Sequence, residues 1–146
     1  MIFGAQVFAN FINLSGLPNA LVDLVEAMQL SSVGTVFAVC VICIVMGMIF
    51  EAIGILLLIV PVFLPTLIIM DVDLIWFGIV MVVVVELGLI TPPIGMNVFT
   101  VRTMMPDLRL SKIFRGVMPF VAADLVALGL LFAFPAIAVW LVGINW

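Results

Sequence analysis

The stretch ELGLITPPIGMNVF, from Glu86 to Phe99, decides how the rest of this chain is interpreted. It lies in a strongly apolar region, yet it contains a carboxylate, a Pro-Pro pair, two glycines, a threonine and an asparagine. Pro92 and Pro93 lack backbone donors and clash with the preceding turn, so a continuous helix is not expected to pass through them. A break in hydrocarbon is tolerated where it is buried in protein or lines a cavity. Because secondary transporters hold ions and substrates at such breaks, the stretch predicts part of a transporter.

Composition places the chain in the membrane and excludes several functions. Its 146 residues are 68% hydrophobic and 8% charged, whereas soluble domains carry about 25% charged residues. All of the basic residues fall between 102 and 115, in a segment too short to predict nucleic-acid binding: Arg102, Arg109, Lys112 and Arg115. The chain has no histidine, and no serine–lysine, paired-aspartate or zinc set predicts an intramembrane enzyme. We therefore expect an all-α polytopic membrane protein that is not an enzyme.

Apolar runs and turn residues divide the chain into five predicted segments. These are the end of a membrane helix at 1–13, an interfacial amphipathic helix at 17–30, a hairpin at 33–70, a broken helix at 74–104 and a last membrane helix at 113–142. Trp140 and Trp146 are predicted interface anchors. Cys40 and Cys43 form a C-x-x-C pair inside an apolar run and are predicted to pack as small hydrophobic residues.

Residues 33–70 are predicted to enter and leave the membrane on one side. Two full spans need about 20 residues each plus a turn, and this run leaves almost nothing for the turn. Gly47, Glu51 and Gly54 suit a tight reversal, and Pro61 and Pro65 are expected to interrupt the return arm. A re-entrant hairpin fits this pattern better than the alternative of two short tilted helices.

The positions of the charges predict the orientation. Basic loops stay cytoplasmic, so residues 102–115 are predicted to face the cytoplasm, and Asp71 and Asp73 the opposite side. The last helix then leaves the C-terminus periplasmic. Within that helix, Asp124 is expected to pair with water or, by snorkelling, with Arg115.

Two motifs carry a resemblance to a known family. GMIFEAIGILLLIVPVFLP, at 47–65, and ELGLITPPIGMNVF closely resemble the large, DctM-like membrane subunit of TRAP (tripartite ATP-independent periplasmic) transporters. The resemblance runs from the SGLP turn to the tryptophan-rich end. It implies one repeat of an elevator-type fold of the ion transporter superfamily, with a re-entrant hairpin and a broken helix, in the bacterial inner membrane.

The same resemblance implies a function. The family imports C4-dicarboxylates, sialic acid and other organic acids, driven by a sodium gradient. A periplasmic binding protein delivers the substrate, and a small membrane subunit pairs with the large one. Sodium is the coupling ion, and no other cofactor is implied.

The resemblance also implies roles for individual residues. Sodium is expected between the hairpin turn and the break, held mostly by backbone oxygens and by the Thr91 hydroxyl, at four positions: Gly47, Gly88, Thr91 and Ile94. Five others are expected to lie on the substrate side or to brace the loop: Pro92, Pro93, Gly95, Asn97 and Glu51. Glu51 has a second interpretation, as a carboxylate that caps the hairpin.

Only the second of the family's two inverted repeats is present in this chain. We therefore expect a C-terminal fragment, a split-gene product or a truncated sequence, and no uptake by this chain without the first repeat. Two alternatives stay open from the residues alone. One is a carrier of another ion in the same superfamily, and the other is a structural or assembly subunit that transports nothing.

Overall fold

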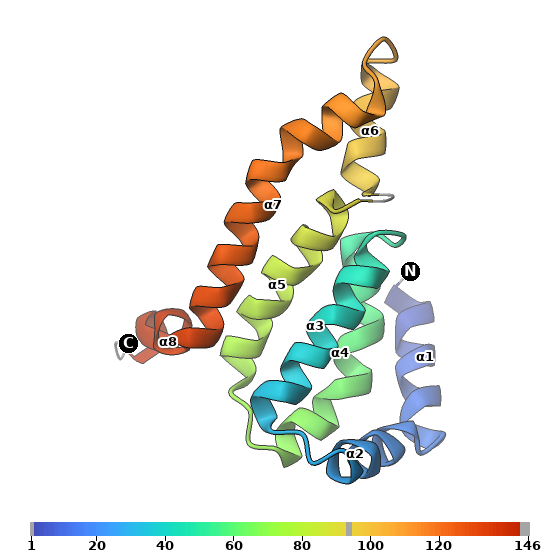
Figure 1. The fold of residues 1–146 in the computed structure, drawn as a ribbon. Coiled ribbons are helices and arrows are strands. Elements are labelled where there is room, and N and C mark those ends of the chain that lie inside the picture. The colour runs from blue at the N-terminus through green and yellow to red at the C-terminus, as the bar shows by residue number, and fades with distance from the viewer. Residues whose placement is uncertain (1, 93–94, 144–146) are drawn as a thin grey trace.

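The computed structural model describes residues 2–92 and 95–143, and Figure 1 shows their fold. Over these ranges the chain forms helices joined by short turns. In chain order they are α1 (Ile2–Leu14), α2 (Leu17–Ala27), α3 (Ser32–Gly47), α4 (Ala52–Ile69), α5 (Leu74–Ile90), α6 (Met96–Met104), α7 (Leu110–Ala133) and α8 (Ala136–Gly143). Helices α4 and α7 are long and apolar enough to cross a membrane. All regular secondary structure in the described residues is therefore helical, and two of the helices are long enough to cross a membrane.

Helices α3 and α4 form an antiparallel hairpin whose turn is residues 48–51. At the open end, the Ser32 hydroxyl donates to the Met70 carbonyl over 3.2 Å, which joins the first turn of α3 to the end of α4. Ser31 caps α3, and its hydroxyl accepts from the Gly34 amide at 3.2 Å. The hairpin therefore begins and ends at the same end of the molecule.

The core of the hairpin packs on α5. The residues of α3 and α5 that are buried in this core are Val36, Val39, Cys40, Cys43, Trp76, Phe77, Val80, Met81, Val84 and Val85. Both cysteines are free, and Cys43 Sγ lies 3.9 Å from Met81 Sδ. The C-x-x-C pair thus contributes to packing, as its apolar surroundings predict.

At the end of this interface the two helix backbones touch. A Cβ atom placed on Gly47 would lie 2.9 Å from the Gly88 Cα, and one placed on Gly88 would lie 2.8 Å from the Gly47 Cα. Real Cβ atoms do not approach backbone so closely. Both positions therefore require glycine, because a side chain at either one would push α3 and α5 apart.

The prediction that Pro61 and Pro65 interrupt the return arm of the hairpin is wrong. Helix α4 is continuous, with Pro61 and Pro65 inside it. Each proline removes one amide donor, so the carbonyls of Leu57 and Pro61 lose their usual intrahelical partners. Transmembrane helices tolerate such prolines where neighbouring helices support them. Helix α4 has this support, because α1, α2, α3 and α5 all pack against it.

The last segment, predicted as one helix over 113–142, is instead two helices. Helix α7 ends at Ala133, and α8 begins at Ala136 and runs at a steep angle to α7 (Figure 1). Phe134 precedes Pro135 and leaves the helical conformation, with φ −133° and ψ 72°, because proline disfavours helical geometry in the residue before it. Trp140 is 68% exposed on α8, and Trp146 lies outside the described residues.

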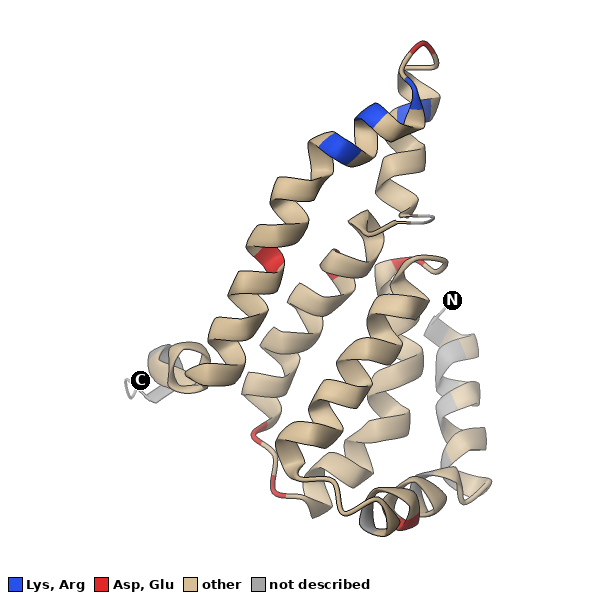
Figure 2. Ribbon diagram, in the orientation of Figure 1, with Lys and Arg blue, Asp and Glu red and all other residues tan. Residues whose placement is uncertain are grey.

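The basic residues gather at one end of the helices, whereas acidic residues lie at the opposite end, along the helices and in the hairpin turn (Figure 2). The basic residues and Asp107 lie at the α6–α7 end, whereas Asp71 and Asp73 lie at the open end of the hairpin. The predicted basic loop at 102–115 is largely helical: Arg109 is the N-cap of α7, and the other three basic residues lie in α6 or α7. Asp73 caps α5 and accepts from the amides of Ile75 and Trp76 at 2.8 and 3.0 Å.

Helix α7 is attached to α5 by aromatic contacts near the open end of the hairpin. The Trp76 indole donates to the Leu131 carbonyl over 2.8 Å. The Trp76 and Phe132 rings meet edge to face with centroids 5.3 Å apart. These contacts hold α7 beside α5, so that the two helices frame the broken segment.

Gly47→Ala and Gly88→Ala should each destabilise the fold. Overpacking of this kind costs about 1–3 kcal/mol, and here the clash is with backbone that cannot rotate away. The free energy of unfolding in detergent micelles, followed by circular dichroism, measures the effect.

Gly78→Ala is the matched control. Gly78 lies on the same helix as Gly88, and an added Cβ meets nothing within 4 Å. Alanine is favoured over glycine in a helix by about 1 kcal/mol, so this variant should be neutral or more stable. Equal stabilities for the three variants would contradict the close contact.

Candidate functional site

The break in the apolar region lies between α5 and α6. Thr91 ends α5: its amide donates to the Gly88 carbonyl over 3.3 Å, and its hydroxyl donates to the Leu87 carbonyl. Pro92 is exposed and supplies no amide. Two of the predicted site residues, Pro93 and Ile94, lie outside the described residues. A continuous helix would pair the carbonyls of Gly88 and Leu89 with the amides at positions 92 and 93, and the prolines there have no amide hydrogen to donate.

Gly95 begins the second half of the broken helix in a left-handed conformation, with φ 56°. Its carbonyl accepts from the amides of Val98 and Phe99 at 2.9 and 3.2 Å. A Cβ placed on Gly95 would lie 3.2 Å from the Thr91 oxygen and 3.3 Å from the Leu89 oxygen. Two carbonyl oxygens thus converge on the space that the missing side chain leaves, and the positive φ also favours glycine here.

The hairpin turn meets the break at the same level along the helices (Figure 1). The contact is between Gly47, the last residue of α3, and Gly88, near the end of α5. The hypothetical Gly88 Cβ is also 3.0 Å from the Ile44 oxygen, and the Gly47 Cβ is 3.5 Å from the Val85 oxygen. The carboxyl ends of two helices therefore lie side by side. Each end carries roughly half a negative charge, so this place favours a cation.

The structure divides the predicted site residues into three groups. In the first group, Gly47 and Gly88 are in contact, and the Thr91 amide donates a hydrogen bond to the Gly88 carbonyl. Glu51 lies in the hairpin turn but is exposed, and its carboxylate accepts from the Gly54 amide at 3.1 Å as the N-cap of α4. Asn97 lies in the first turn of α6 and lines a separate groove.

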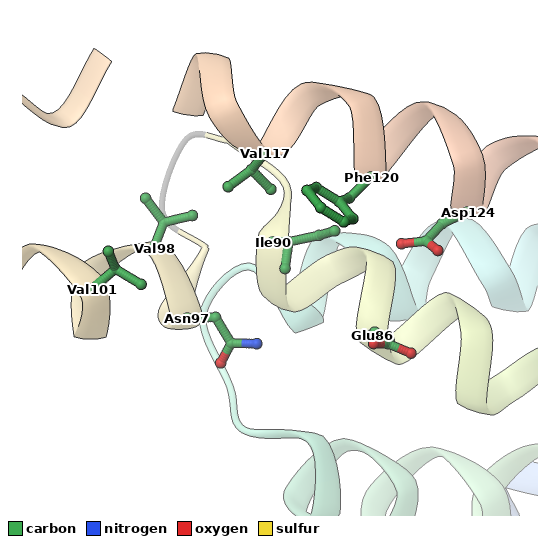
Figure 3. A pocket seen from close by; sticks show the side chains of 8 residues that line it. All are labelled: Glu86, Ile90, Asn97, Val98, Val101, Val117, Phe120 and Asp124. Carbon is green, nitrogen blue, oxygen red and sulfur yellow. The ribbon is translucent and has the colours of Figure 1, made fainter. Parts of the chain in front are cut away.

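That groove is a cavity of about 330 Å³ between α5, α6 and α7, drawn in Figure 3. Its lining residues are Glu86, Ile90, Asn97, Val98, Val101, Val117, Phe120 and Asp124. Glu86 is exposed and Asp124 is half-buried. Sequence reasoning expected Asp124 to meet water or Arg115 and did not place it with Glu86. The available signal was a carboxylate within an apolar helix, but only the packing of α7 on α5 brings the two acids to one groove.

The chain matches a family model over most of its length. The model is the DctM component of the tripartite ATP-independent periplasmic transporters, and it matches residues 1–137. This confirms the resemblance carried by the two sequence motifs. No solved structure matches the chain.

Curated relatives agree with the family model. The C4-dicarboxylate TRAP transporter large permease protein DctM of Pseudomonas aeruginosa is 31% identical over 146 residues, which is 100% of this chain and 34% of the relative. The ectoine TRAP transporter large permease protein TeaC of Halomonas elongata is 31% identical over 134 residues, 92% of this chain and 31% of the relative.

A third relative is a longer protein. The isethionate TRAP transporter permease protein DctMQ of Oleidesulfovibrio alaskensis is 26% identical over 139 residues, 95% of this chain and 22% of the relative. The chain thus spans about a third or less of the length of these three relatives. It belongs to the DctM family of TRAP transporter permeases, a family of membrane transport proteins rather than enzymes.

Proposed function

We propose that this chain forms the coupling-ion part of a sodium-driven transporter that imports organic acids delivered by a periplasmic binding protein. The observation that supports this most is the contact of Gly47 with Gly88 beside the broken helix. It brings the carboxyl ends of α3 and α5 together beside a segment in which two prolines supply no amide donors.

A sodium ion suits this place for chemical reasons. It is a hard cation that prefers oxygen ligands, and unwound backbone in transporters supplies carbonyls for it. Thr91 Oγ1 uses its proton in the bond to the Leu87 carbonyl, which leaves oxygen lone pairs for a cation. The proposed ligands are the backbone at Gly47, Gly88 and Ile94, together with the Thr91 hydroxyl.

The second half of the broken helix is the proposed substrate side. Gly95 is the N-cap of α6 and has no side chain to cap it, so no capping side chain competes with an anion for the amino end of the helix. Amides at a helix N-terminus, with the positive end of the helix dipole, bind carboxylates well. We assign Pro92, Pro93 and Asn97 to keeping this loop open, and Glu51 to holding the hairpin turn as its cap.

Relatives with different substrate names share this segment. The printed names include C4-dicarboxylate, isethionate, ectoine and sialic acid, and those relatives match 92% or more of this chain. A shared part is better suited to ion coupling than to choosing among substrates. We therefore assign the substrate choice largely to the remainder of the permease and to the binding protein. The name DctMQ supports association with a small membrane subunit.

The proposed membrane placement follows from charge and helix length. The basic α6–α7 end is cytoplasmic by the positive-inside rule, and the acidic open end of the hairpin is periplasmic, as is the C-terminus. The hairpin turn ends at the level of the break and well short of the basic end (Figure 2). On this placement we propose that the hairpin is re-entrant and that its turn stops within the membrane, although α4 alone is long enough to cross it.

Thr91→Ala, made in the complete transporter, should raise the sodium concentration for half-maximal uptake. Removing one oxygen ligand from a desolvated cation costs about 1–3 kcal/mol by analogy with a charged hydrogen bond, or about five- to 150-fold in affinity. Thr91→Ser keeps the oxygen and should be mild. The measurement is a sodium titration of uptake in vesicles at matched expression.

Thr100→Ala is the control for this series. Thr100 makes the same kind of bond, from its hydroxyl to the Met96 carbonyl over 3.1 Å, but it is exposed and beyond the break. It should leave the sodium dependence unchanged. If Thr91→Ala also leaves it unchanged, the hydroxyl is no ligand, and an assembly without any sodium dependence would overturn the proposed coupling.

Single cysteines test the membrane placement in a background with Cys40 and Cys43 replaced by alanine. Val33→Cys and Met70→Cys should react with an impermeant thiol reagent from the periplasmic side. Phe50→Cys, in the hairpin turn, should not react from the cytoplasmic side. Met104→Cys, at the basic end and 78% exposed, should react only from the cytoplasm and confirms that the reagent has entered. Cytoplasmic labelling of Phe50→Cys would replace the re-entrant hairpin with two full spans.

A further inference from the structure

Three of the four basic residues follow one face of α7. Arg109 is the N-cap of the helix, and Lys112 and Arg115 follow at three-residue spacing, so the three lie within about a third of the helix circumference. All three are exposed. The only acid between 102 and 115 is Asp107, so this end of the molecule carries an excess of positive charge (Figure 2).

Beyond Arg115 the same face of α7 continues as an exposed apolar surface. Met118, Ala122 and Leu125 follow at helical spacing. Met118 is 49% and Leu125 is 52% exposed. At Leu125 this face reaches an apolar groove of about 310 Å³ between α7 and α3, which is lined by Phe37, Leu125, Leu128, Gly129 and Phe132. One face of α7 therefore carries cations at one end and apolar side chains beyond them.

We propose that this face of α7 binds an anionic phospholipid. The phosphate lies on Lys112 and Arg115, and one acyl chain lies along Met118, Ala122 and Leu125. The cations and the apolar surface follow one another in the order in which a lipid presents its headgroup and its chain. Charge complementarity supplies the headgroup contact, because basic clusters at the cytoplasmic end of a membrane helix attract anionic lipids.

Distances along α7 match the depth of a lipid in the bilayer. Arg115 and Ala133 are 18 residues apart, or about 27 Å along the axis, which is close to the ~30 Å thickness of the hydrocarbon core. Arg115 therefore lies near the headgroup boundary when α7 crosses the membrane. Leu125 is about 15 Å from Arg115 along the axis, so the apolar face is about as long as one leaflet is deep.

A lipid is favoured over a segment of the rest of the permease by the charges that each requires. A protein partner would have to present acidic groups to Lys112 and Arg115, whereas the phosphates of a bilayer already lie at this level. The groove between α5, α6 and α7 suits an acyl chain less well, because Glu86 and Asp124 line it. The inference rests on the proposed membrane placement, but not on sodium coupling or on the substrate.

Native mass spectrometry of the complete transporter, purified with its partner subunits, measures the binding of added phosphatidylglycerol. Lys112→Gln with Arg115→Gln should weaken this binding by about 25-fold, since each basic residue near a membrane surface contributes about fivefold. If the double variant fails to assemble, Arg115→Gln alone should weaken binding by about fivefold. Lys112→Arg with Arg115→Lys keeps both charges and should bind normally.

Arg102→Gln is the control for the loss of a charge elsewhere at the basic end, because Arg102 lies on α6, and it should change the binding little. Phosphatidylcholine, which has no net charge, should bind more weakly than phosphatidylglycerol. Equal binding of the two lipids, or equal binding by the unchanged transporter and the glutamine variants, would overturn the proposal.

A phosphatidylglycerol with a photoreactive group at the end of one acyl chain tests the apolar part of the site. It should label the peptide that contains Leu125, and unlabelled phosphatidylglycerol should prevent this labelling whereas inorganic phosphate should not. Labelling confined to other helices would show that another part of the permease covers this face and would refute the inference. The reaction of Met104→Cys separates the two failures. Labelling of that cysteine from the periplasm overturns the membrane placement together with this inference, whereas cytoplasmic labelling without lipid binding overturns this inference alone.

Discussion

The backbone contact between Gly47 and Gly88 is the constraint on which the site depends. With a hypothetical Cβ only 2.8 to 2.9 Å from the opposite Cα, no side chain separates α3 from α5 there. The hairpin turn is consequently held beside the break. A broken helix in an apolar solvent requires such cover, because its free carbonyls otherwise face hydrocarbon.

The ends of the helices near this contact have complementary character. The carboxyl ends of α3 and α5 meet and favour a cation, whereas the uncapped amino end of α6 favours an anion. Thr91 and Gly95 arrange the turn between them, one by a hydroxyl bond to the preceding carbonyl and the other by a left-handed conformation. A single interruption therefore offers places of opposite polarity for an ion and an organic acid, as the proposed function requires.

The outer surface of the molecule has a different role from the break. Large apolar side chains such as Phe37, Val41 and Ile53 are exposed, which suits contact with lipid or with neighbouring helices. Within this surface, Glu86 and Asp124 line the groove between α5, α6 and α7. Polarity at the break serves the proposed ion and substrate, and these two carboxylates lie apart from it on the groove.

The sequence by itself determined the class, the family and the place of the break. Apolar runs, the Thr-Pro-Pro interruption and the clustered basic residues are local features that no packing could reverse. The tertiary structure alone decided that Gly47 touches Gly88, that α4 stays helical through Pro61 and Pro65, and that Asp124 shares a groove with Glu86. Pro135, in contrast, ends α7 within the segment predicted as one helix. The physical reason is that a proline permits a helix break and a glycine permits a close backbone contact, but neither requires it. Packing by neighbouring helices decides whether the helix breaks and whether the backbones touch.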